Sequence, residues 1–174
     1  MEKTVTTAWY RHRVFRWLRD LVIFGVIFGG ITWFQTRNLL DRGTTLPVTS
    51  LKQLDGNTFD LKTMNGKPTL LYFWAPWCSV CKSNAHNVRA IVGDGHNIAS
   101  VALSYESLDQ VRSFAQEYDM PQPVLLGGNE DSTAFKIEAF PTVYVLNRDG
   151  EVAFATMGYT SEIGLRARLW AAGL

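Results

Sequence analysis

Short apolar runs alternate with segments of helical spacing along most of this chain. Apolar runs bounded by turn residues predict strands at 48–54, 58–61, 70–74, 97–104, 124–126, 142–147 and 151–156. Helical spacing and end signals predict helices at 79–92, 107–118, 132–137 and 161–172. Along the chain, the predicted elements are first a pair of strands, then strands joined by parallel crossovers, and finally a hairpin and a helix. It predicts an α/β fold whose mixed central sheet has flanking helices.

The N-terminal segment has a different pattern, because residues 21–34 are apolar and carry no charge. Extended to 17–36, the segment reaches the roughly twenty residues that a membrane helix needs. Trp17 and Trp33 would then lie at the two membrane interfaces, where indole rings are favoured. A cleaved signal peptide and a buried core helix are the alternatives, but no A-x-A-like cleavage site follows. We therefore expect an uncleaved N-terminal transmembrane helix at 17–36.

Charge indicates how such an anchor is oriented. The first twenty residues carry five basic side chains, at positions 3, 11, 13, 16 and 19. Basic residues before a span favour the cytoplasmic side, so we expect 1–16 in the cytoplasm. The polar stretch 37–47 is expected to be a linker, and 48–174 the folded domain outside the cytoplasm. The whole chain has a formal net charge of only +1, so no nucleic-acid partner is expected.

The only two cysteines, Cys78 and Cys81, lie three residues apart where a predicted strand meets a predicted helix. At that spacing both thiols lie on one helix face and can close a small disulfide ring. The first turn of a helix also favours the thiolate. Two cysteines are too few for a disulfide framework or a zinc site, and the three histidines lack ligand spacing. We expect a redox-active dithiol, with no metal and no other cofactor.

Residues 74–82, Trp-Ala-Pro-Trp-Cys-Ser-Val-Cys-Lys, resemble the W-A-x-W-C-x-x-C-[KR] signature of the thioredoxin superfamily. Further along, Phe140-Pro141-Thr142 resembles the cis-proline segment that faces the active-site disulfide in that family. The resemblance covers 46–174 and implies a thioredoxin-like fold. Within the family, the chain resembles the membrane-anchored extracytoplasmic branch that includes TlpA, ResA and CcmG. In that branch it is most similar to ScsD, the suppressor of copper sensitivity type.

The resemblance implies roles for several residues. Cys78 would be the nucleophile that forms a mixed disulfide, and Cys81 would resolve it. Substrate binding would fall to four residues, Trp77, Phe140, Pro141 and Thr142. The sequence also indicates that Gly158 allows a loop to approach the site closely, with an ordinary turn glycine as the alternative.

Two departures from the family concern the proton of Cys81. Tyr72 stands where thioredoxin has a buried Asp, and Asn84 stands where ResA-type proteins have a Glu. Glu138 could approach the site instead, or it could be an exposed loop residue. A water or a thiolate of the partner could also accept the proton.

The expected function is a membrane-tethered thiol-disulfide oxidoreductase, an enzyme that reduces the disulfides of extracytoplasmic proteins. Ser79 and Val80, between the cysteines, are not basic, which favours a moderately reducing potential. The resemblance implies re-reduction by a transmembrane donor of the DsbD or ScsB type. It also implies a place in the bacterial inner membrane, with the catalytic domain in the periplasm as a tethered monomer. The alternatives are a copper-stress or metal-delivery binding protein of the same fold, and a redox-inert scaffold.

Overall fold

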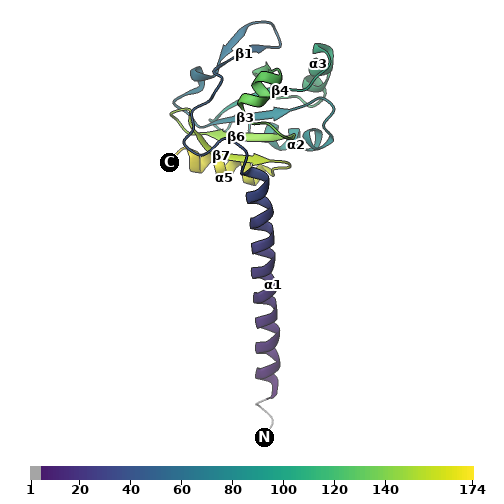
Figure 1. The fold of residues 1–174 in the computed structure, drawn as a ribbon, viewed down its shortest axis with the longest axis vertical. Coiled ribbons are helices and arrows are strands. Elements are labelled where there is room, and N and C mark those ends of the chain that lie inside the picture. The colour runs from purple at the N-terminus through teal and green to yellow at the C-terminus, as the bar shows by residue number, and fades with distance from the viewer. Residues whose placement is uncertain (1–4) are drawn as a thin grey trace. The chain divides into compact units, whose positions relative to one another are not determined.

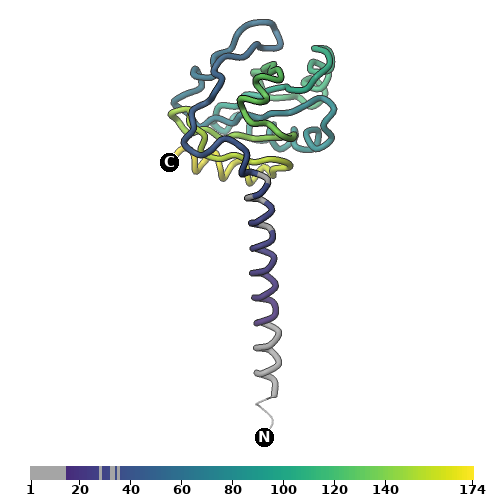
Figure 2. The backbone as a smooth tube through the Cα atoms, viewed as in Figure 1, coloured from purple at the N-terminus to yellow at the C-terminus, as the bar shows by residue number. Residues whose placement is uncertain are grey.

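The computed structural model describes residues 5–174, with side chains from residue 15 onward except at positions 28, 32, 33 and 35. Figure 2 marks the remaining residues in grey. The described chain forms two units, which divide between Arg37 and Asn38. The expected interfacial position of Trp33 and the basic side chains at 3, 11 and 13 lie outside the description.

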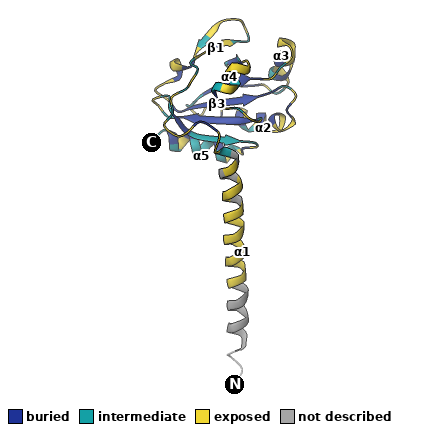
Figure 3. Ribbon diagram, viewed as in Figure 1, coloured by how far each residue is buried: buried dark blue, intermediate teal, exposed yellow. Residues whose placement is uncertain are grey.

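The first unit consists of one helix, α1 (Val5–Thr36), which begins well before the predicted start at residue 17. Its described apolar side chains are exposed, among them Phe24 and Ile27. Figure 3 colours the described part of the α1 ribbon mostly yellow, for exposed residues. Arg19 and Asp20 form an ion pair at 2.8 Å just before the uncharged stretch. Within the described part of the chain, no helix is both long and apolar enough to cross a membrane. The membrane helix expected at 17–36 is therefore not confirmed.

The second unit is built on one mixed sheet of seven strands, in the order β2-β1-β5-β4-β3-β6-β7 (Figure 1). Strand β3 pairs in parallel with β4 and antiparallel with β6. The strands are β1 (Ser50–Gln53), β2 (Thr58–Asp60), β3 (Thr69–Trp74), β4 (Asn97–Ala102), β5 (Val124–Leu126), β6 (Thr142–Leu146) and β7 (Val152–Met157). The helices are η1 (Leu61–Met64), α2 (Ser79–Ala90), α3 (Leu108–Glu117), α4 (Asn129–Ala134) and α5 (Glu162–Ala172). The predicted α/β fold and all seven predicted strands are confirmed.

Two helices differ from the prediction for local reasons. Helix α4 begins three residues earlier than predicted, because the Asp131 carboxylate accepts a hydrogen bond from the Gly128 N–H at 2.7 Å and caps the first turn. The short helix η1 was not predicted at all. Asp60 begins it by accepting a hydrogen bond from the Lys62 N–H at 2.9 Å. A single carboxylate therefore decides where each of these short helices begins.

Every residue of β3 is buried, and its side chains divide the unit into two cores. Alternate residues point to opposite faces of a strand. Leu70, Tyr72 and Trp74 pack against α2, α3 and α5, in a core that also contains both cysteines. Leu71 and Phe73 pack on the other face, against η1 and the end of α4. Phe114 of α3 stacks on Trp74 with ring centroids 4.4 Å apart, which fixes this helix over the end of β3.

The expected linker 37–47 needs correction, because much of it packs into the second unit. Leu39 is 1% exposed and Leu40 is 8% exposed, and both belong to the core that contains Phe73. The Leu40 N–H donates to the Tyr144 hydroxyl at 3.2 Å, and that hydroxyl donates to the Phe135 carbonyl at 2.7 Å. The burial of Leu39 and Leu40 was not predicted, because the stretch around them is mostly polar. They fill a core position that the sheet leaves open.

This packing predicts that Leu39→Ala destabilises the second unit by about 2–5 kcal/mol, as large-to-small changes at buried sites do. Leu174→Ala is the matched control, since that side chain is 90% exposed and should cost under about 0.5 kcal/mol. Urea unfolding of the full chain, followed by tryptophan fluorescence, measures both. Equal midpoints for the two variants would contradict the packing and restore a free linker.

Candidate active site

The two cysteines lie where β3 gives way to α2, and they form a disulfide. Cys78 is the N-cap of α2, with extended backbone angles of φ −80° and ψ 109°. Its Sγ accepts a hydrogen bond from the Cys81 N–H at 3.0 Å. Their Cα atoms are 5.2 Å apart, within the usual range for a disulfide. A donor aimed at Sγ and the positive end of the helix both stabilise a thiolate at Cys78 when the disulfide is open.

Burial distinguishes the two sulfur-bearing residues. Cys78 retains 5% of its surface, whereas Cys81 retains none. A sulfur of another molecule can therefore reach Cys78 first. The division of roles in which Cys78 attacks and Cys81 resolves stays a prediction.

The segment Phe140-Pro141 has a cis peptide bond, as predicted, and it leads directly into β6. Thr142 pairs with Phe73 in the sheet, so the start of β6 lies beside the end of β3, where the cysteine loop begins. The Phe140 and Trp77 rings form a T-shaped pair at an interplanar angle of 81°, with centroids 5.7 Å apart. The fold thus brings the cis-proline segment and the cysteine loop together from distant parts of the sequence.

Trp77 is 65% exposed, yet a hydrogen bond holds its ring in place. Its Nε1–H donates to the Ser104 carbonyl at 2.8 Å. Ser104 has φ 52°, a left-handed conformation that is uncommon for a residue other than glycine. No local pattern indicates this contact, because Ser104 is only the last residue of the strand predicted at 97–104. An exposed, oriented indole beside Cys78 is a surface that a substrate polypeptide can contact.

The structure narrows the roles that the sequence indicated for Thr142 and Gly158, and for Gly158 it agrees with the alternative of a turn glycine. The Thr142 side chain is buried and donates to the Ala139 carbonyl at 2.8 Å, and the residue pairs with Phe73 and Met157 in the sheet. A Cβ added at Gly158 would meet no atom within 4 Å, so close approach is not the reason for this glycine. The reason is its φ of +86°, which makes it a turn glycine. Its N–H donates to the Pro141 carbonyl at 2.7 Å.

Two uncharged side chains, Tyr72 and Asn84, occupy the core beneath the disulfide. The Tyr72 hydroxyl donates to the Cys81 carbonyl at 3.2 Å, and Asn84 accepts a hydrogen bond from the Thr160 N–H at 2.9 Å. Burial raises the pKa of Tyr72 well above its usual range, while the nearby Asn84 amide acts in the opposite direction to a smaller extent. Neither side chain can accept a proton from Cys81 at neutral pH.

Glu138, the other candidate proton acceptor, is an exposed side chain. Its carboxylate accepts hydrogen bonds from the Asn38 amide at 3.0 and 3.3 Å. This contact agrees with the alternative of an exposed loop residue, since it ties the loop to the start of the second unit.

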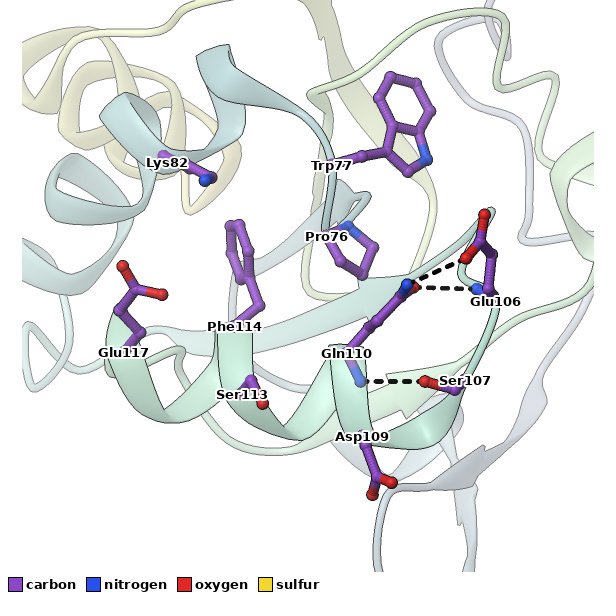
Figure 4. Close-up of a pocket in the computed structure, with 10 residues that line it drawn as sticks. All are labelled: Pro76, Trp77, Lys82, Glu106, Ser107, Asp109, Gln110, Ser113, Phe114 and Glu117. Carbon is purple, nitrogen blue, oxygen red and sulfur yellow. Dashed lines mark hydrogen bonds between the residues drawn. The ribbon is translucent and has the colours of Figure 1, made fainter.

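A groove of about 470 Å³ lies between the cysteine loop and α3 (Figure 4). Its apolar lining comes from Pro76, Trp77 and Phe114. On the α3 side, the Gln110 amide donates to the Glu106 carboxylate at 3.2 Å and accepts from the Glu106 N–H at 3.1 Å. The groove therefore presents a mixed apolar and polar surface beside Pro76 and Trp77, which precede Cys78 in the chain.

Comparison with known proteins agrees with this geometry. Residues 43–155 match the AhpC/TSA family. The chain is 26% identical to the thioredoxin-like protein YneN of Bacillus subtilis, over 88% of this chain and 96% of that protein. It is 32% identical to a thioredoxin-like protein of Haemophilus influenzae, over 70% and 73%. It is 30% identical to the thiol-disulfide oxidoreductase ResA of Oceanobacillus iheyensis, over 79% and 77%.

Solved structures share the fold. Mycobacterium tuberculosis dsbF matches with a TM-score of 0.65 at 24% identity, covering 75% of this chain and all of that one. StoA of Bacillus subtilis matches with a TM-score of 0.59 at 23% identity, over 72% and 98%. The fold is thus thioredoxin-like, as predicted, while the narrower resemblance to ScsD stays a prediction. Because the family match spans well over half of the chain and includes the cysteine pair, the protein belongs to the AhpC/TSA thioredoxin-like family and is a thiol-disulfide oxidoreductase.

Proposed function

We propose that this protein reduces disulfides of extracytoplasmic proteins while tethered to the bacterial inner membrane. The observation that carries the proposal is the Cys78–Cys81 disulfide at the start of α2, in which Cys78 retains 5% of its surface and Cys81 retains none. The cis-proline segment beside it supports binding of an extended substrate, because Phe140 precedes the paired part of β6 and its backbone can pair with an extended polypeptide.

The reaction begins with both cysteines reduced. The Cys78 thiolate attacks one sulfur of the substrate disulfide, that bond breaks, and a mixed disulfide forms while the other substrate sulfur leaves as a thiolate. Cys81 then loses its proton and attacks the Cys78 sulfur, which releases the second substrate thiolate. Two electrons pass to the substrate, its two sulfurs become thiols, and the enzyme ends with the Cys78–Cys81 disulfide. With Tyr72 and Asn84 uncharged, the departing substrate thiolate or a water is the base that takes the Cys81 proton.

The direction of electron flow is inferred from the residues between the cysteines. Ser79 and Val80 provide no positive charge to stabilise the Cys78 thiolate. A less stabilised reduced form has a lower reduction potential, which favours a reductant. An enzyme that reduces its substrates must itself be re-reduced, and we propose a transmembrane donor of the DsbD or ScsB type for that step.

The tether is inferred from α1. Residues 21–34 carry no charge, and large apolar side chains around the helix are exposed, Val22, Phe24 and Ile27 among them. A helix that is apolar on all sides is favoured in a lipid environment rather than in water. Basic residues precede this stretch, which supports a cytoplasmic N-terminus and a periplasmic catalytic unit.

Replacing the resolving cysteine should trap substrates. In Cys81→Ser, the mixed disulfide at Cys78 persists because no neighbouring thiol can release it. Non-reducing electrophoresis of the full chain, mixed with an oxidised protein, should show a new species that disappears with reductant. Cys78→Ser is the control and should trap far less, because Cys81 is buried. Trapping at equal levels by both variants would argue against the proposed roles.

Equilibration with glutathione buffers should give the Cys78–Cys81 pair a reduction potential below about −150 mV. In Val80→His, a positive charge beside Cys78 stabilises the thiolate, so the potential should rise by about 30 mV. Val80→Thr, which keeps size and neutrality, should leave it unchanged. A wild-type reduction potential above about −150 mV would contradict the proposal that the protein is a reductant.

The tether predicts that the full chain sediments with bacterial inner membranes and withstands a high-salt wash. Ile23→Arg combined with Ile27→Arg should release it, since each arginine near a helix centre costs about 2.5–3.5 kcal/mol of insertion free energy. Ile163→Arg is the control, an exposed isoleucine of α5 that should not affect sedimentation. Complete removal of the wild-type chain by salt would refute the tether.

A further inference from the structure

Two asparagines of α2 hold one residue of the loop that follows β7. Asn84 is fully buried, and its side-chain oxygen accepts a hydrogen bond from the Thr160 N–H at 2.9 Å. Asn87 lies nearly one helical turn further on, and its amide donates to the Thr160 carbonyl at 3.1 Å. Both backbone groups of Thr160 are thus bound by side chains of the helix that carries Cys81. Thr160 itself is only 6% exposed.

The same loop is bound to the cis-proline segment at its other end. The Gly158 N–H donates to the Pro141 carbonyl at 2.7 Å. Gly158 and Thr160 are separated by one residue, Tyr159, which is 61% exposed and leaves the backbone to carry the connection. A short series of hydrogen bonds therefore runs from α2, through residues 158–160, to Pro141.

Asn84 is a costly residue for a purely structural position. Its side-chain Nδ2 is buried and has no hydrogen-bond partner within the described part of the chain. The amide is near enough to act on the Tyr72 hydroxyl, but the geometry falls short of a hydrogen bond. Burying an unsatisfied donor is unfavourable, and an apolar side chain of similar volume would fill the space without that penalty. The bond from Thr160 to the Asn84 oxygen is the feature that an apolar side chain could not replace.

We propose that Asn84 is a positioning residue: through Thr160 and Gly158 it fixes the Pro141 backbone relative to the cysteine helix, and so sets where an extended substrate lies for attack by Cys78. The inference rests on the proposed reduction of protein disulfides and concerns how that site holds its substrate. Asn87 contributes the second bond to Thr160. The substrate class that depends on this geometry is an extended polypeptide, because it needs a backbone partner at the cis-proline segment.

Asn84→Leu retains volume and removes the acceptor. For an oxidised protein substrate, we expect KM to rise about tenfold with kcat little changed, since losing one buried hydrogen bond is worth about that factor. Reduction of oxidised glutathione should change less than about twofold, because this small disulfide depends less on an extended binding segment. Asn87→Ala removes a half-buried contact and should shift KM in the same direction by a smaller factor. It also tests the inference if Asn84→Leu does not fold.

Asn97→Ala is the matched control. The Asn97 amide donates to the Met64 carbonyl at 2.6 Å, and the residue pairs with Thr69 at the opposite end of β3 from the cysteine loop. Its loss should lower the melting temperature without changing KM. If Asn84→Leu and Asn87→Ala also lower only the melting temperature, or slow both substrates equally, the positioning role is wrong.

Hydrogen exchange separates this inference from the proposed function. In Asn84→Leu the Gly158 amide should exchange about tenfold faster than in the wild type, and in Asn97→Ala it should not. A wild-type chain that reduces neither substrate would refute the proposed function, while the Gly158 amide would still report whether Asn84 holds the loop. Unchanged Gly158 exchange in a folded Asn84→Leu chain would overturn the inference, whatever the activity.

Discussion

Burial of β3 on both faces is the constraint on which the rest of the second unit depends. The strand supplies side chains to both cores, and it is paired on one side with β4 and on the other with β6. Its last residue, Trp74, is fixed by Phe114, so the chain leaves the sheet at a defined point. The cysteine loop begins there. Because β6 is antiparallel to β3, the start of β6 and the cis-proline before it lie next to the end of β3, where the cysteine loop begins.

The chemistry at this edge depends on backbone groups more than on charged side chains. Sγ of Cys78 is met by an N–H of α2, Trp77 by a carbonyl, and Pro141 by another N–H. Beneath them, Tyr72 and Asn84 are polar but uncharged at neutral pH. A site of this kind binds and orients through geometry. Neither Tyr72 nor Asn84 can take a proton from Cys81 at neutral pH.

Much of this could be predicted from the sequence, and the misses have physical causes. Strand β3 and the cysteine helix have strong local signals, apolar continuity in one and a cysteine pair at a strand end in the other. Leu39 was missed because a short apolar pair within a polar stretch has no periodicity, and only the sheet shows the space it fills. From the sequence, Asn84 could be interpreted only as the residue that replaces a glutamate of ResA-type proteins. Its bond to Thr160 joins residues 76 positions apart, which no local pattern can reveal.

The two cores, one on each face of β3, differ in whether they contain the cysteines. The face of β3 that carries Tyr72 contains the cysteines, whereas the face that carries Phe73 contains neither. Side chains on the second face, such as Phe135 and Tyr144, meet the reactive pair only through the sheet between them. Substitutions at Phe135 or Tyr144 therefore act on the core without cysteines, whereas Phe140 packs against both cores and is the side chain through which the two faces meet. The sheet thus separates the core that contains the redox-active cysteines from the core that does not.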